Sequence, residues 1–121
     1  MRTLFEEMGG DSAIEAIVEL HYARVLGDPQ LAPFFDGLDM PLQKRKFRAF
    51  LHTVTGGMGR RSDLELRAAH SRALDQGLTA AHVDIFIDHL TDALSEAHID
   101  EDLAGRVLWA VRVKRAHVMG T

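Results

Sequence analysis

Apolar residues recur every three to four positions in several stretches of this 121-residue chain, which is the period of an amphipathic α-helix. The clearest stretch is residues 40–55. Asp39 stands before it as an N-cap, and Pro41 suits its first turn, where no backbone N–H is needed. The pattern therefore predicts a helix whose apolar side carries Phe47, Phe50, Leu51 and Val54.

No segment shows the alternation of polar and apolar residues that a β-strand requires, so we expect an all-α protein. Glycines and capping residues divide the chain into helical pieces. Ser12 with Glu15, and Ser62 with Glu65, have the spacing of a capping box. The other expected helices are residues 2–8, a segment from Ser12 to Gly27, residues 62–75, a segment from Thr79 through Leu94, and one carrying Leu103 through Val118.

Length and composition predict one globular domain over residues 1–121, since 46% of the residues are hydrophobic and 26% are charged. The formal net charge of −4 argues against nucleic acid as the main partner. The absence of cysteine excludes disulfides and thiolate metal ligands. The chain shows neither a signal-peptide pattern nor a membrane-spanning apolar run, so we expect a cytoplasmic monomer with no membrane partner.

Several common enzyme motifs are missing from the sequence. The glycine-rich run at 56–61 follows a helix rather than a strand, and it lacks the spacing and the Lys-Ser/Thr end of a phosphate-binding loop. The chain contains neither the His-Glu-x-x-His pair of zinc proteases nor the G-x-S-x-G elbow of hydrolases. Zinc-dependent hydrolysis and acyl transfer therefore have no support in the sequence.

Two polar residues begin the apolar side of the helix at 40–55. Lys46 lies four residues before Phe50, and Gln43 lies three residues before Lys46, so both fall on the side that should face a core. Lys44 and Arg45 point away from that side and are typical of a solvated surface. An amide and an ammonium at the start of a core-facing stripe therefore require a separate explanation.

His70 is the histidine most suited to a metal. It lies in mid-helix, with Leu66 one turn before it and Leu74 one turn after it. A hydrogen bond from one ring nitrogen to a backbone carbonyl would leave the other nitrogen free to bind a metal. From this pattern alone, a hydrogen-bonded core histidine and a metal ligand both remain open. We assign no function from the pattern to the other histidines, and we regard His21 as a structural residue at a helix edge beside Tyr22.

The combined motifs resemble the truncated haemoglobins, specifically their first group. The resemblance extends from Leu4 to about His117 and rests on paired glycines before a helix bearing Tyr22, on Phe34-Phe35, on the string DMPLQKRKF, on Gly56-Gly57 and on the string LRAAH. It implies a shortened globin fold, with two helices packed across two around one haem b. It also implies that His70 is the proximal iron ligand.

The resemblance gives the remaining site residues their expected roles. Tyr22 and Gln43 match the distal pair that hydrogen-bonds a bound gas, and Phe35 matches a phenylalanine packed on the haem. The stripe that begins with Gln43 would therefore face the iron, where each donor is worth about 0.5–1.5 kcal/mol. Phe47 departs from the pattern, because many relatives carry glutamine there. The residues expected to line the pocket are Phe47, Phe50, Leu51, Leu66, Val83 and Phe86.

Two roles in this scheme stay open. Lys46 either reaches a haem propionate or water with its ammonium, or binds the iron as a sixth ligand through its neutral amine. The second role requires the pKa of the amine to fall below about 10.4, which burial and the iron charge both favour. His117 matches a position at which some relatives bond covalently to a haem vinyl group.

The resemblance favours a haem protein that binds O₂, NO and CO. A second hypothesis is nitric oxide dioxygenation, in which O₂ and NO give nitrate and an unidentified reductase restores the ferrous iron. A third is a haem-free helical module that binds another protein, which would leave His70, Tyr22 and Gln43 without a shared purpose.

Overall fold

The computed structural model describes residues 2–56 and 77–114, and the regular structure in these two ranges is helical, without strands. The prediction of an all-α protein is confirmed for this part of the chain. The elements are α1 (Leu4–Met8), α2 (Gly10–Leu26), a 3₁₀ turn η1 (Ala32–Phe35), α3 (Met40–Val54), α6 (Ala80–Glu96) and α7 (Glu101–Arg112).

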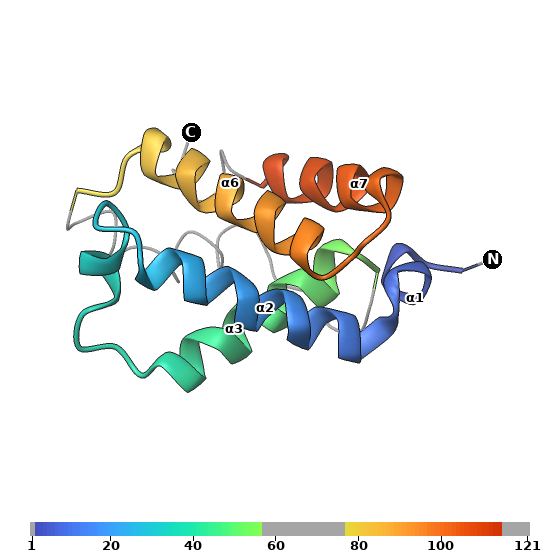
Figure 1. The fold of residues 1–121 in the computed structure, drawn as a ribbon, viewed down its shortest axis with the longest axis horizontal. Helices are drawn as coiled ribbons and strands as arrows, with labels where there is room; N and C mark the ends of the chain where they lie inside the picture. The colour runs from blue at the N-terminus through green and yellow to red at the C-terminus, as the bar shows by residue number, and fades with distance from the viewer. Residues whose placement is uncertain (1, 57–76, 115–121) are drawn as a thin grey trace.

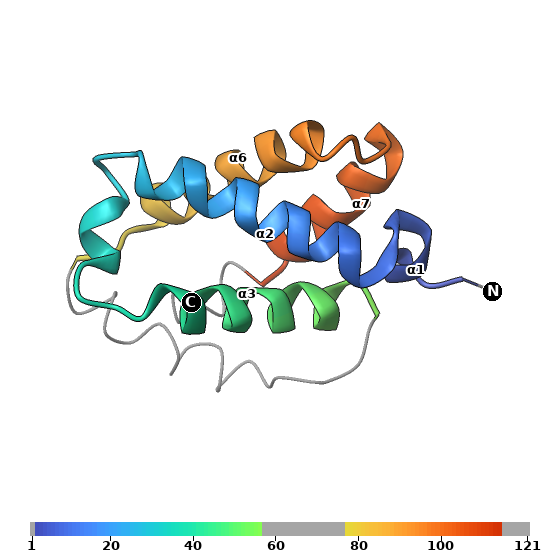
Figure 2. The same cartoon turned by 60° about the horizontal axis from the view of Figure 1, so that its bottom comes forward.

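The four long helices form two crossed pairs, α2 with α3 and α6 with α7 (Figures 1 and 2). Helix α2 runs through the middle of the molecule, with α6 above it and α3 below it, while α7 passes behind α2 toward α3 (Figure 2). It contacts both α6 and α3, while α7 contacts α6 and α3. This arrangement confirms the predicted two-over-two helical sandwich.

Two predicted caps are present. The Asp39 carboxylate accepts a hydrogen bond from the Leu42 backbone N–H at 3.1 Å and starts α3 with Pro41 in its first turn. Thr79 caps the start of α6 in the same way, and Nδ1 of His82 accepts a hydrogen bond from the Thr79 backbone N–H at 3.0 Å. These local signals therefore fix where α3 and α6 begin.

The predicted start of the second helix is wrong. Helix α2 begins at Gly10 rather than after Ser12, so Ser12 lies within the first turn and does not cap it. Gly9 has a φ of 116°, a left-handed conformation in which glycine avoids a Cβ clash. This turn lets α2 follow α1 directly, without a side-chain cap.

The last described helix is shorter than its apolar stripe suggests. Helix α7 ends at Arg112, and Val113 is its C-cap. Val118 and His117 lie outside the described residues, as does the helix predicted at 62–75 with its Ser62 capping box. None of the described helices is both long and apolar enough to span a membrane.

The core lies where α2 crosses α3 and α6. Its largest fully buried aliphatic side chains include Ile14, Ile17, Leu51, Leu90 and Leu94. Burial of each such side chain contributes about 1.5–3 kcal/mol. The core therefore holds α2 rigidly against its two partners and fixes the position of Tyr22, which lies further along the same helix.

Candidate functional site

An aromatic cluster surrounds Tyr22 at the meeting point of α2, η1, α3 and α6. The ring centroid of Tyr22 lies 5.7 Å from Phe35, 5.7 Å from Phe47 and 6.2 Å from Phe86, all in edge-to-face arrangements. Such pairs combine apolar burial with a favourable fit of ring edges to ring faces. Three residues from three separate elements thus fix the ring of Tyr22, which is only 4% exposed.

The phenol of Tyr22 lacks a hydrogen-bond partner among residues 2–56 and 77–114. Burial raises the pKa of this phenol well above its usual value, so the group stays protonated at neutral pH. Buried tyrosines usually pair their O–H group. Within the described residues, the cluster therefore contains a buried, protonated donor whose hydrogen bond is unused.

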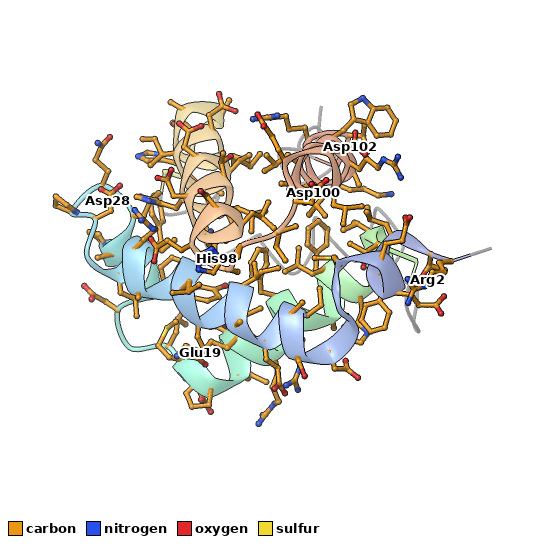
Figure 3. All side chains as sticks on the ribbon, turned by 45° about the vertical axis from the view of Figure 1, so that its right-hand side comes forward. Arg2, Glu19, Asp28, His98, Asp100 and Asp102 are labelled. Atoms are coloured by element: carbon orange, nitrogen blue, oxygen red, sulfur yellow. The ribbon has the colours of Figure 1, made fainter. Side chains whose placement is uncertain are left out.

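Helix α3 places its cations on two different flanks. The Lys44 ammonium lies 2.9 Å from a carboxylate oxygen of Glu19, and Arg48 lies 3.2 Å from Glu15, so this flank faces α2. Glu19 is labelled on α2 in Figure 3. The sequence suggested a solvated Lys44. In the structure its side chain is instead ion-paired and half-buried.

Gln43, Lys46 and Phe50 form the other flank of α3, because 100° per residue turns them away from Lys44 and Arg48. Gln43 and Phe50 are half-buried, and Lys46 is exposed. Neither the side chain of Gln43 nor that of Lys46 is joined by a hydrogen bond or ion pair to another described residue. We call this set the open flank of α3.

The remaining predicted pocket residues differ in burial. Phe47 lies between the two flanks and is buried, as is Leu51 one turn later. Val83 and Phe86 of α6 are half-buried, as is Phe35 of η1. The structure thus brings together Tyr22, Phe35, Phe47 and Phe86. The predicted roles of Leu66, His70 and His117 are not tested, because these residues lie outside the described ranges.

His21 is part of this cluster, although its predicted place was at a helix edge. The side chain is fully buried rather than at a helix edge, because it continues the apolar spacing of Ile14 and Ile17. Its ring stacks on Phe47 at 4.8 Å and meets Phe86 edge-on at 4.3 Å. This spacing could have predicted a buried His21, but histidine is counted as polar and was therefore not placed on the apolar side.

The turn that carries Phe35 is tied to α6 by an ionisable pair. Nε2 of His89 lies 2.7 Å from a carboxylate oxygen of Asp28, in the loop after α2 (Figure 3). The hydrogen bond from His89 lowers the pKa of the Asp28 carboxyl. The Asp28 backbone carbonyl also accepts hydrogen bonds from Leu31 at 3.0 Å and Ala32 at 2.8 Å. Asp28 therefore fixes the backbone of the loop between α2 and η1 and connects this loop to α6.

Residues 3–119 match the bacterial-like globin family. The chain belongs to this family. The globin shares 34% identity over 108 residues with the group 1 truncated hemoglobin GlbN of Synechocystis sp., which covers 88% of this chain and 87% of that protein.

Solved structures agree with this assignment. The 2/2 hemoglobin of Synechococcus sp. PCC 7002, solved in the cyanomet state with covalently attached heme, is 32% identical with a TM-score of 0.91 and covers 99% of this globin and 100% of its own chain. Chlamydomonas reinhardtii THB1 is 37% identical with a TM-score of 0.83, and the match covers 98% and 97% of the two chains. The expected truncated haemoglobin resemblance is confirmed, and with it a haem cofactor and haem-based gas binding in general.

Proposed function

We propose that this globin binds O₂, NO and CO at a haem b held by His70 and bordered by the Tyr22 cluster and the open flank of α3. The observation that carries the proposal is the phenol of Tyr22, a buried and protonated donor without a partner among the described residues. When bound, the haem supplies an iron at which a diatomic gas is held. The apolar aromatic side chains of the Tyr22 cluster are suited to contact with such a macrocycle.

The polar residues would select and retain the gas. The O–H of Tyr22 and the side-chain N–H of Gln43 would each donate a hydrogen bond to a gas that carries partial negative charge, at about 0.5–1.5 kcal/mol apiece. O₂ gains more from such donors than the less polar CO. Phe47 adds no donor and instead excludes water. The other residues proposed to touch the haem are Phe35, Phe50, Leu51, Leu66, Val83 and Phe86.

Lys46 is the proposed internal sixth ligand when no gas is present. Its place on the open flank, one turn of α3 after Gln43, and its lack of a described ion-pair partner support this role. The amine must lose its proton to bind iron, so the role strengthens as pH rises. The competing role, an ammonium at the pocket edge near a haem propionate, would not show this pH dependence of iron coordination.

His117 is the proposed point of covalent attachment to the haem. The support is a relative, the Synechococcus 2/2 hemoglobin, which has been solved with covalently attached heme. Acid–acetone extraction of this globin should leave haem on the protein, whereas a His117→Ala variant should release it. Clean extraction of haem from the unmodified chain would exclude the bond.

Nitric oxide dioxygenation is a second candidate function, because the donors that retain O₂ would hold it for reaction with NO. The reaction combines O₂, NO and one electron into nitrate, and the electron must come from a separate reductase. Rapid mixing of the O₂-loaded globin with NO, with and without a reductase, distinguishes a single turnover from catalysis.

Titration with haemin tests the proposed cofactor site. The unmodified chain should bind an equimolar amount and give a sharp Soret band, ferric and then dithionite-reduced. A His70→Gly variant should lose this spectrum and regain it when imidazole is added. A spectrum of free haemin with the unmodified chain would contradict the proposal, and unchanged binding by His70→Gly would contradict the role of His70.

A further inference from the structure

His21 is the only histidine of the described ranges that is fully buried. Its Nε2 lies 3.0 Å from the backbone carbonyl oxygen of Phe86 on α6. A carbonyl can only accept, so Nε2 carries the proton and donates it. Nδ1 is then an unprotonated acceptor, and it is buried without a hydrogen-bond partner among residues 2–56 and 77–114.

The ring of His21 touches three residues of the aromatic cluster at once. It is stacked on Phe47 with an interplanar angle of 28°, and it meets the edges of Phe86 at 4.3 Å and Tyr22 at 5.3 Å. Phe47 and Phe86 also contact Tyr22 directly. The orientation of the imidazole plane therefore affects every described ring around Tyr22 except that of Phe35.

A phenylalanine at position 21 could make similar ring contacts and would leave no buried nitrogen unpaired. The imidazole is the less favourable choice for folding on that ground, because an unpaired buried acceptor is costly. It adds one feature that a phenyl ring cannot supply. The hydrogen bond from Nε2 to Phe86 ties the ring plane to the backbone of α6, and with it the stacked face of Phe47.

We infer that His21 is a positioning residue that fixes the direction of the Tyr22 phenol, acting through Phe47 and Phe86. This inference rests on the proposed function, in which that phenol points at the bound gas. With the imidazole held to α6, the Tyr22 ring has one orientation. Without that hydrogen bond, the cluster keeps its volume but loses the constraint on its ring planes.

The chain offers a selective probe, because Tyr22 is its only tyrosine. Labelling the tyrosine ring with ¹³C therefore reports a single residue in the diamagnetic ferrous CO form of the haem-loaded protein. The infrared C–O stretching frequency in the same sample depends on the electric field at the bound CO, to which the Tyr22 O–H contributes. Both readouts are independent of any catalytic activity.

Two variants separate the contributions of His21, and a third serves as control. His21→Phe retains a ring and removes the donor, whereas His21→Gln retains an N–H donor and removes the ring. His52→Phe is the matched control, because His52 contacts Phe5 at 4.6 Å and pairs with Asp11, away from Tyr22.

The unmodified protein should give one set of Tyr22 ring signals and one C–O band. His21→Phe should give doubled or broadened ring signals, a second C–O band and O₂ release about two- to fivefold faster, with a Tm equal to or above that of the unmodified protein. His21→Gln should retain a C–O band closer to the original, and His52→Phe should leave all of these readouts unchanged.

The outcomes distinguish this inference from the proposed function. If the unmodified chain fails to bind haemin, the proposed function is overturned. If haem binding is normal but His21→Phe leaves the ring signals and the C–O band unchanged, only the role of His21 is overturned, and a lowered Tm would then mark it as purely structural. Multiple C–O bands in the unmodified protein would also overturn the inference, even if neither His21 variant folds.

Discussion

The two flanks of α3 carry similar residues and have different surroundings. On one flank, Lys44 and Arg48 are ion-paired with Glu19 and Glu15 of α2. On the open flank, the side chains of Gln43 and Lys46 have no hydrogen-bonding or ionic partner among the described residues. The polar groups of the first flank join two helices, and those of the second are the groups proposed to meet the haem and its gas. Lys44 and Lys46 are the same residue type, so the presence or absence of an ion-pair partner is what separates a structural cation from a candidate functional one.

Leu51 lies, like Phe47, on the buried strip of α3 between the two flanks, which we call the core seam. Its replacement should have the largest effect on folding. The side chain is 1% exposed, so Leu51→Ala should leave a cavity and lower the free energy of unfolding by about 2–5 kcal/mol. Urea unfolding measures the change, and Ala49→Gly, at an exposed site on the same helix, is the control for helix propensity. A loss under about 1 kcal/mol for Leu51→Ala, close to that of the control, would mean that the seam is not packed as described.

His21 stacks on Phe47 in the same seam and should make stability depend on pH. Burial lowers its pKa to about 4, whereas an unfolded histidine has a pKa near 6.5. Between these values the unfolded chain binds a proton that the folded chain does not, so stability falls as pH decreases. The contribution of His21 should drop by about 2 kcal/mol from pH 7 to pH 5.

Urea unfolding of the unmodified protein and of His21→Phe at the two pH values tests this dependence. The variant should lose less stability on acidification than the unmodified protein. Equal losses would show that His21 titrates normally in the folded state, and thus that it is not buried as described.

Lys46 tests whether the open flank reaches the iron. In the ferric protein without added ligand, the ratio of low-spin to high-spin haem should rise with pH by up to about tenfold per pH unit, because binding of the amine to iron releases one proton. Absorption and resonance Raman spectra measure this ratio. Lys46→Ala should abolish the rise, and Lys44→Ala should preserve it. The same pH dependence in Lys46→Ala would assign the change to hydroxide or another group.

Gln43 and Lys44 compare the two flanks directly. Gln43→Leu should speed O₂ release by up to about tenfold, because one hydrogen bond of about 0.5–1.5 kcal/mol is lost. Lys44→Gln should leave the release rate unchanged and lower stability by at most about 1 kcal/mol, since ion pairs open to solvent on one side contribute little. Stopped-flow exchange of O₂ for CO measures both rates. Similar rates for the two variants would remove the distinction between the flanks.

Much of the fold could be predicted because the decisive signals are local. Asp39 and Thr79 act within one helical turn, and the apolar period selects the buried side of α3 and α6. The start of α2 could not be predicted from Ser12, because the left-handed backbone of Gly9 replaces a side-chain cap. The end of α7 at Arg112 does not follow from an apolar stripe, which has no stop signal of its own.

The candidate site was predicted from motifs more than from physical pattern. Tyr22, Phe35, Phe47 and Phe86 do come together, although they are far apart in the sequence. His21 was missed because a histidine is counted as polar even where its position is apolar. The ion pairs of Lys44 and Arg48 depend on the crossing of α2 and α3, which no local pattern specifies. The roles of His70, Lys46 and His117 remain predictions.

The most direct test of the central claim is the rate of O₂ dissociation from the ferrous protein with and without the Tyr22 hydroxyl. Tyr22→Phe keeps the ring and its edge contacts with Phe35, Phe47 and Phe86, and it removes only the donor. We predict O₂ release up to about tenfold faster in this variant, with CO release and thermal stability nearly unchanged. An O₂ release rate equal to that of the unmodified protein would contradict the claim that the Tyr22 phenol donates a hydrogen bond to the bound gas.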